Sequence, residues 1–259
     1  MNDLTTILFD LDDTLIIEWD SARNTFIETV SDLDISNKNE FVSIIREEAR
    51  LLWYKLPTIE YCLKVGISSW EALWADFTGK DENLIRLKEY SADYRLNAWN
   101  NALLKTGISD IKLAKDLSDR FKLLRNQKHI LFPDTIPCLN KLKNKYKLGL
   151  ITNGAPDIQW KKIEGGKLSN YFNPIIISGE YGTGKPDPFL FEKAFNKSNS
   201  DINTSLFIGD SLGTDIEGAI RIGLKCIWLN RDNRINNNGK IKPDFELKSL
   251  TDLDKFIVS

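Results

Sequence analysis

The chain has 259 residues, of which 42% are hydrophobic and 28% charged, and its net charge of −2 gives no overall electrostatic attraction to nucleic acid or to an anionic membrane. Its three cysteines are widely spaced and odd in number, which favours buried thiols in a reducing compartment over a disulfide framework or a zinc site. No apolar run approaches the roughly 18 residues that a membrane-spanning helix needs, and no signal peptide is evident, so we expect a cytoplasmic protein.

The first predicted element is a short apolar strand over residues 5–11, and acidic residues stand at its end. Asp10, Asp12 and Asp13 follow the apolar run within four positions. Asp13 is interpreted as a turn or solvent-facing residue. Because ligands and active sites of parallel α/β sheets lie at the carboxyl ends of strands, Asp10 and Asp12 are the first candidate functional residues.

Residues 18–127 have a different, helical texture. Asn37 with Glu40, and Ser68 with Glu71, have the spacing of helix-capping boxes, and each pair precedes an apolar pattern with helical periodicity. Five of the seven tryptophans fall in this stretch, and we expect them to form its core. The sequence therefore predicts an all-helical domain, residues 18–127, inserted into a core of residues 1–17 and 128–259.

After this insertion, strands and helices alternate to the end of the chain. Short apolar runs predict strands at 147–152, 174–178, 206–209, 224–229 and 244–247. Between them, Asp134 is predicted to cap a helix, Pro156 and Pro188 each begin one, and Gly223 ends one. This repetition predicts an α/β fold with a doubly wound parallel sheet.

Polar residues recur where these predicted strands end. Thr152 and Asn153 end the second strand, Lys185 lies in a proline-rich turn, and Asp210 and Asp215 follow a fourth strand. Carboxylates that converge on one spot repel one another unless a hard cation joins them. The sequence therefore predicts a magnesium ion and an anionic substrate at this edge of the sheet.

In order along the chain, Asp10-x-Asp12-x-Thr14, Thr152-Asn153-Gly154, Lys185-Pro186 and Gly209-Asp210-x4-Asp215 resemble the four motifs of the haloacid dehalogenase-like (HAD) hydrolase superfamily. The resemblance covers the α/β part, for which it implies the Rossmann-like HAD core. The helical insertion resembles the cap of the C1-capped phosphatases, a branch that includes enzymes acting on N-acylneuraminate 9-phosphate, nucleoside monophosphates and phosphoserine.

The resemblance implies a role for each motif residue. Asp10 is the nucleophile that becomes an aspartyl-phosphate, and Asp12 is the general acid and then base, which needs a raised pKa near pH 7. Lys185 holds the nucleophile and the phosphoryl group, with Thr152 and Asn153 around the phosphate. The metal ligands implied are Asp10, Asp12 and Asp210 for Mg²⁺, with Asp215 acting through water or a hydrogen bond.

The function expected from these residues is a Mg²⁺-dependent phosphatase for a small phosphorylated metabolite, acting as a monomer or weak dimer without nucleic-acid or membrane partners. A phosphomutase of the β-phosphoglucomutase type and a non-catalytic binding protein on the same fold are the alternatives. Carbon–halogen cleavage needs no metal, so the additional aspartates argue against it. The only histidine, His129, lies at the predicted return from the cap to the core, where we expect a structural or exposed role, and this argues against a Ser–His–Asp hydrolase.

Overall fold

The computed structural model of the chain describes residues 3–237 and 239–257. These residues divide into two compact units. One consists of the described parts of residues 1–17, 130–153 and 166–259, and is called the sheet unit. The other consists of residues 18–129 and 154–165, and is called the helical unit.

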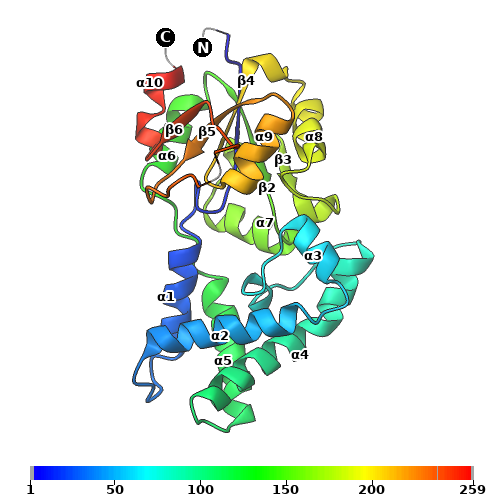
Figure 1. Ribbon diagram of the computed structural model, residues 1–259, viewed down its shortest axis with the longest axis vertical. Helices are drawn as coiled ribbons and strands as arrows, with labels where there is room; N and C mark the ends of the chain where they lie inside the picture. The colour runs from blue at the N-terminus through cyan, green and yellow to red at the C-terminus, as the bar shows by residue number, and fades with distance from the viewer. Residues whose placement is uncertain (1–2, 238, 258–259) are drawn as a thin grey trace. The chain divides into compact units, whose positions relative to one another are not determined.

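The sheet unit is built on six parallel strands in the order β3-β2-β1-β4-β5-β6 (Figure 1). The first strand of the chain is thus central, and the chain builds outward from it in both directions, as in doubly wound folds. The predicted α/β class and its six strands are confirmed. Their bounds are β1 Thr6–Phe9, β2 Lys147–Thr152, β3 Ile175–Ile177, β4 Ser205–Gly209, β5 Lys225–Leu229 and β6 Phe245–Leu247.

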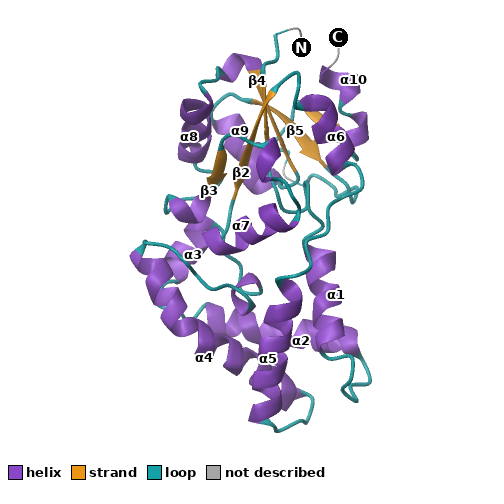
Figure 2. Cartoon of the chain, turned by 180° about the vertical axis from the view of Figure 1, so that it is seen from behind, coloured by secondary structure: helices purple, strands orange, loops and turns teal. Residues whose placement is uncertain are grey.

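Helices cover both faces of this sheet, which explains why its central strands are apolar along their length. Figure 2 shows α8 (Pro188–Ser198) and α9 (Glu217–Arg221) on one side, and α6 (Thr135–Leu142) and α10 (Asp254–Ile257) on the other. The four residues of β1 are all buried. Leu8 packs with Phe191 of α8 and Phe207 of β4 in the core under α8 and α9.

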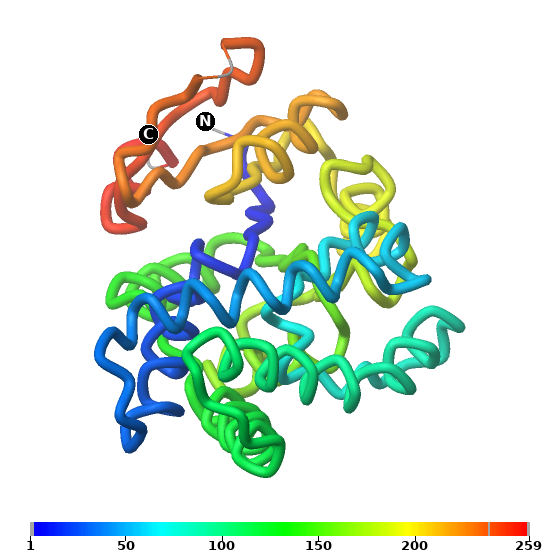
Figure 3. Tube along the Cα trace, turned by 60° about the horizontal axis from the view of Figure 1, so that its bottom comes forward, coloured from blue at the N-terminus to red at the C-terminus, as the bar shows by residue number. Residues whose placement is uncertain are grey.

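Helices form the second unit, and its described residues contain no strand. In this unit α2 packs against α4, and α4 against α5 (Figure 3). Trp53, Trp74 and Trp99 are buried in its core as predicted, whereas Trp19 and Trp70 are only partly buried against it. The helix bounds are α1 Trp19–Thr29, α2 Lys38–Trp53, α3 Ile59–Val65, α4 Glu82–Lys105, α5 Ile111–Arg125 and α7 Pro156–Gly165.

Of three predicted capping signals, the two at Asn37 and Ser68 are confirmed and the one at Asp134 is wrong. The Asn37 side chain accepts a hydrogen bond from the Glu40 amide at 3.1 Å, as a cap of α2 should. Ser68 and Glu71 do form a box, but it starts only a three-residue 3₁₀ turn, Glu71–Leu73. The Asp134 side chain does not cap α6, because it is engaged instead by Arg231 at 2.9 Å and by the Leu250 amide at 2.8 Å.

Helix α7 belongs to the helical unit although it follows β2 in the chain. Lys162 of α7 forms an ion pair with Glu71 at 2.7 Å, and Asp157 accepts a hydrogen bond from the Asp76 amide at 2.7 Å. These polar contacts, together with Ile158 in the apolar core of the unit, hold α7 there. The helical unit therefore includes residues 154–165 in addition to the inserted segment.

Candidate active site

The sequence motifs meet at the carboxyl edge of the sheet, next to the point where the strand order reverses. Asp10 directly follows β1, Thr152 ends β2, and Asp210 directly follows β4. The Asp10 amide donates to the Ile208 carbonyl of β4 at 2.9 Å, so the sheet ladder continues to the first residue of the site. An α/β sheet binds its ligands at such a switch point.

Lys185 contacts residues of three other segments at this site. Its Nζ atom lies 2.5 Å from Asp10 Oδ1 and 2.7 Å from Asp215 Oδ1, and it donates to the Ile151 carbonyl at 2.7 Å. All three charged side chains are buried. A buried ammonium with three oxygen partners is held in a single position, which fixes Asp10 and Asp215 relative to each other.

Burial and like charges act on the carboxyl groups here. Burial, followed by the charge of Asp215, raises the pKa of Asp10 well above its usual value, although Lys185 opposes this shift. Burial and Asp215 also raise the pKa of Asp210 to about 7, with Arg234 opposing. Burial alone would lower the pKa of Lys185, but Asp10 and Asp215 raise it above its usual value. The cluster thus holds more negative charge than its own cations offset.

The donor set suits a hard divalent cation. One carboxylate oxygen from each of Asp10, Asp210 and Asp215 lies within 4.8 Å of the others. Oxygen donors are what Mg²⁺ prefers, and Mg²⁺ usually keeps several waters, so a few carboxylates are sufficient. The residues present fit such an ion, and Asp215 belongs to this group together with Asp10 and Asp210.

Asp12 and Asp13 lie in the turn after β1. Asp12 is partly buried, and its charge is one of those that raise the pKa of Asp10, although desolvation by burial and Asp215 act more strongly. Asp13 adopts a left-handed backbone conformation, with φ of 54°, and its amide donates to the Ile16 carbonyl at 2.8 Å. This confirms the prediction that Asp13 is a turn residue.

Asn153 has a contact that sequence reasoning missed. Its side-chain amide donates to the Lys185 carbonyl at 2.9 Å, and its Oδ1 accepts from the Lys185 amide at 2.8 Å. An asparagine can make this pair of bonds with one residue's backbone because it carries a donor and an acceptor. Asn153 thereby fixes the backbone of Lys185, while Thr152 beside it is fully buried.

Gly209 makes room for Asp215. A Cβ atom built at Gly209 would lie 2.5 Å from the Asp215 carboxyl carbon, so this close approach of β4 requires glycine. The Ser211 amide donates to Asp215 Oδ2 at 3.0 Å and holds the carboxylate in the turn. The close approach of the Asp215 side chain therefore explains why glycine precedes Asp210 in this motif.

Arg234 is a residue of the candidate site that sequence reasoning did not identify. Its guanidinium forms an ion pair with Asp210 Oδ2 at 2.9 Å. The sequence around it, rich in Asn, Arg and Gly, indicates only an exposed loop. The local sequence pattern does not distinguish Arg234 from the nearby Arg231. Only the folded path of the loop, which returns to the edge of the sheet, brings Arg234 to Asp210.

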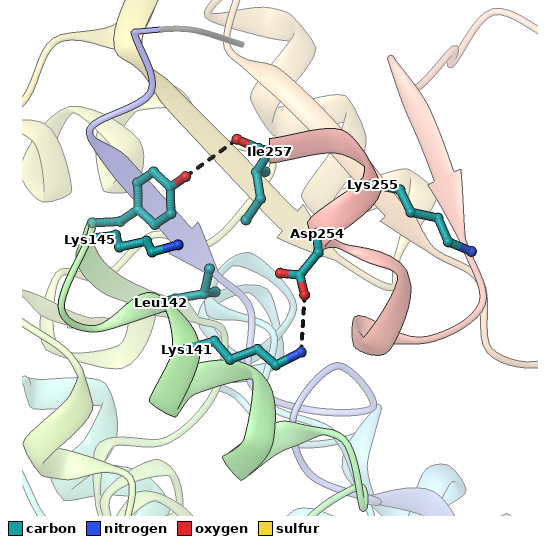
Figure 4. Close-up of a pocket in the computed structure, with 7 residues that line it drawn as sticks. Lys141, Leu142, Lys145, Asp254, Lys255 and Ile257 are labelled. Carbon is teal, nitrogen blue, oxygen red and sulfur yellow. Dashed lines mark hydrogen bonds and ion pairs between the residues drawn. The ribbon is translucent and has the colours of Figure 1, made fainter. Parts of the chain in front are cut away.

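Other features of the chain lie away from these motifs. A 610 Å³ cavity lined by Lys141, Lys145, Tyr146 and the α10 residues Asp254 and Ile257 lies beside the amino end of β2, the end opposite to Thr152 (Figure 4). His129, in the helical unit, hydrogen-bonds to the Asn126 carbonyl at 3.0 Å. Among the described residues, no helix is both long and apolar enough to cross a membrane.

Comparison with known proteins places this geometry in a family. The model of a family described as haloacid dehalogenase-like hydrolase matches residues 7–229. The chain is similar to phosphoserine phosphatase of Thermus thermophilus, with 27% identity over 95% of this chain and 96% of the relative. It is also similar to N-acylneuraminate-9-phosphatase of Mus musculus, with 27% identity over 98% and 93%. Among solved structures, the HAD-hydrolase YfnB of Bacillus subtilis, described as bound to magnesium, has a TM-score of 0.68 and 21% identity, with 97% of each chain covered.

Proposed function

Because the chain belongs to the haloacid dehalogenase-like hydrolase family, we propose that it is a Mg²⁺-dependent phosphatase that hydrolyses small phosphomonoesters through an aspartyl-phosphate on Asp10. The observation that carries this proposal is the cluster of Asp10, Asp210 and Asp215 around one point, with Lys185 bonded to two of them. The two relatives named above are called phosphatases, and the match covers nearly their whole length, which supports the reaction class.

Asp10 is suited to attack phosphorus because its carboxylate is the first side chain beyond the central strand and is fixed by Lys185 at 2.5 Å. An ionised carboxylate attacks the phosphoryl group, the bond to the leaving oxygen breaks, and the phosphoryl group remains on Asp10. Water then hydrolyses this acyl-phosphate and regenerates the carboxylate. Lys185 offsets negative charge on the nucleophile and on the transferring group in both steps.

Asp12 is the proposed proton carrier. It stands two residues after Asp10 in the same turn, so it can give a proton to the leaving oxygen and later take one from the attacking water. Its main-chain carbonyl is the remaining proposed metal ligand. A bound Mg²⁺ ion supplies charge stabilisation to the transferring phosphoryl group and lowers the repulsion between that group and Asp10.

Thr152 and Asn153 are proposed to surround the phosphoryl oxygens with neutral donors. Asn153 uses its side-chain amide to fix the Lys185 backbone, so its contribution to phosphate binding is assigned to backbone N–H groups at the end of β2. In this proposal, the Asn153 side chain links the backbone of Lys185 to the end of β2, where the phosphate would bind. The substrate is proposed to be a small phosphorylated metabolite, in a reducing, cytoplasmic setting that suits three free, buried cysteines.

A phosphomutase on the same residues is the second candidate, because Asp10 and Asp12 would serve it equally. The two are distinguished by products, since a mutase isomerises a sugar phosphate without net release of phosphate. A non-catalytic binding protein has no need to keep Asp10, Lys185 and Asp210 together, and the geometry disfavours it. A dehalogenase needs no metal, and the additional carboxylates disfavour that reaction as well.

The deciding experiment is phosphate release with Mg²⁺ from a panel of several dozen phosphometabolites, with wild type and Asp10→Asn compared. We expect kcat to fall by at least about 10³-fold in Asp10→Asn, because a neutral amide cannot serve as the nucleophile. Asp20→Asn, at an exposed position of α1, is the matched control and should retain wild-type activity. Equal phosphate release by wild type and Asp10→Asn would refute the proposed nucleophile.

A further inference from the structure

We propose that Arg234 is a positioning residue, which holds the Asp210 carboxylate ready to bind the divalent ion; this inference rests on the proposed function. Arg234 comes from the loop after β5, outside all four sequence motifs. It nevertheless contacts the one residue of the fourth motif that directly follows β4. A residue with this role acts on the metal through Asp210 and does not itself touch substrate.

The first argument is the way in which Arg234 holds Asp210. A single guanidinium nitrogen, Nη2, donates to Asp210 Oδ2 at 2.9 Å and to the Asp210 main-chain carbonyl at 2.6 Å. These two bonds close a ring that includes the side-chain torsions of Asp210, so the carboxylate cannot rotate without breaking one of them. Trp228 Nε1 donates to the same carbonyl at 2.8 Å and fixes it from β5.

The second argument is that Arg234 is itself anchored. The Asn230 side chain accepts from the Arg234 amide at 2.7 Å and donates to the Arg234 carbonyl at 2.9 Å. Asn230 is only 1% exposed, and it also bonds Glu246 of β6 at 2.6 Å. Therefore the backbone from which the arginine extends is bound to the ends of β5 and β6, although the side chain of Arg234 is 47% exposed.

The neighbouring Arg231 fixes the other end of the same turn. Its guanidinium binds both oxygens of Asp134, at 2.9 and 3.0 Å, and donates to the Thr14 carbonyl at 2.9 Å. Thr14 ends the first motif. The turn from Asn230 to Arg234 thus contacts the first and the fourth motif at once, which orders the loop on the metal side of the sheet.

The third argument is charge. Asp10, Asp12, Asp13, Asp210 and Asp215 carry up to five negative charges around this point, of which Lys185 and Arg234 offset two. Negative charge therefore remains for a divalent ion, so Arg234 and the ion can be held together. The bond from Arg234 uses Oδ2 of Asp210, which leaves Oδ1 to the metal. Hydrogen bonds that orient a ligating carboxylate typically contribute 10–100-fold to metal affinity.

The test is calorimetric titration of Mg²⁺ alone into wild type, Arg234→Gln, Arg234→Lys and Arg221→Gln. Arg221 is an exposed arginine of α9 that pairs with Glu217, and it serves as the matched control. We expect Arg234→Gln to raise the Kd for Mg²⁺ by about 10–100-fold. Arg234→Lys should raise this Kd by less, and Arg221→Gln should bind Mg²⁺ as wild type does. Thermal unfolding without Mg²⁺ checks that each variant is folded.

Kinetics separates positioning from chemistry. In Arg234→Gln, the Mg²⁺ concentration for half-maximal phosphate release should rise by the same factor as the Kd, while kcat at saturating Mg²⁺ stays within a few-fold of wild type. A Kd that is unchanged or tighter in Arg234→Gln overturns the inference, and a tighter one would make Arg234 a competitor of the metal. If wild type binds no Mg²⁺, the proposed cofactor fails and the inference fails with it, whereas Mg²⁺ binding without phosphate release refutes only the proposed reaction.

Discussion

Among the described residues, a cluster of charged side chains in the helical unit and another in the sheet unit differ in their balance of charge. In the helical unit, Arg125 pairs with Glu18 at 2.5 Å, and Lys162 lies 3.0 Å from Glu18 and 2.7 Å from Glu71. Two carboxylates thus meet two cations. In the sheet unit, Lys185 pairs with Asp10 and Asp215, and Arg234 pairs with Asp210, while the charge of Asp12 also acts on Asp10.

The difference in balance indicates a difference in role. Buried ions are tolerated when each has a partner, and the cluster in the helical unit meets that condition with its own side chains. It joins α1, the 3₁₀ turn at Glu71, α5 and α7, so its role is to hold helices together. The cluster in the sheet unit keeps unbalanced negative charge, which costs stability and is useful only if an ion from solution is bound.

The largest effect that would sharpen this comparison is expected for Lys162→Met. This change leaves the buried carboxylates of Glu18 and Glu71 with Arg125 as the remaining cation of the cluster. Removal of one partner of a buried ion pair typically costs about 3–5 kcal/mol. The free energy of unfolding, measured in urea, should fall by that amount. Lys161→Met is the control, because Lys161 is partly exposed and its pair with Asp76 should contribute at most about 1 kcal/mol. Equal losses in the two variants would contradict a structural role that is specific to the buried cluster.

A somewhat smaller effect should follow addition of Mg²⁺. At a concentration 100 times its Kd, an ion that binds only the folded protein stabilises it by about 2.7 kcal/mol. Thermal unfolding with Mg²⁺ and with a chelator measures this difference. The stabilisation should disappear in Asp210→Asn and persist in Lys162→Met. If Asp210→Asn kept the full stabilisation by Mg²⁺, the ion would bind elsewhere, and the proposed difference in role between the two clusters would be contradicted.

The smallest effect concerns the space around Asp215. In Gly209→Ala the new methyl group would lie 2.5 Å from the Asp215 carboxyl carbon, and overpacking of this kind costs about 1–3 kcal/mol. We expect lower stability and weaker Mg²⁺ binding, measured by urea unfolding and calorimetry. Gly213→Ala is the control, since a Cβ there meets nothing within 4 Å. Similar behaviour of the two variants would show that β4 can move away from Asp215 at little cost.

Local patterns in the sequence were sufficient for the strands and for the four motifs. Apolar runs ended by Asp, Asn or Gly report strands because parallel strands are buried on both faces and their carboxyl ends are polar turns. Capping signals were less reliable. Asp134 has the right residue type before a helix, but a bidentate arginine from a segment 97 positions away binds it more strongly than the helix end does.

The sequence alone thus determined the family and the α/β class, and it predicted the acidic residues that cluster in the candidate site, since each motif consists of residues close together in the chain. Only the tertiary structure showed that Asn153 fixes Lys185, that α7 joins the helical unit and that Arg234 reaches Asp210. Lys162 and Glu71, which hold α7, are 91 positions apart, and Asn153 and Lys185 are 32 apart. Periodicity and spacing carry no information on such pairs, because a polar side chain finds its partner only after the backbone has brought distant segments together.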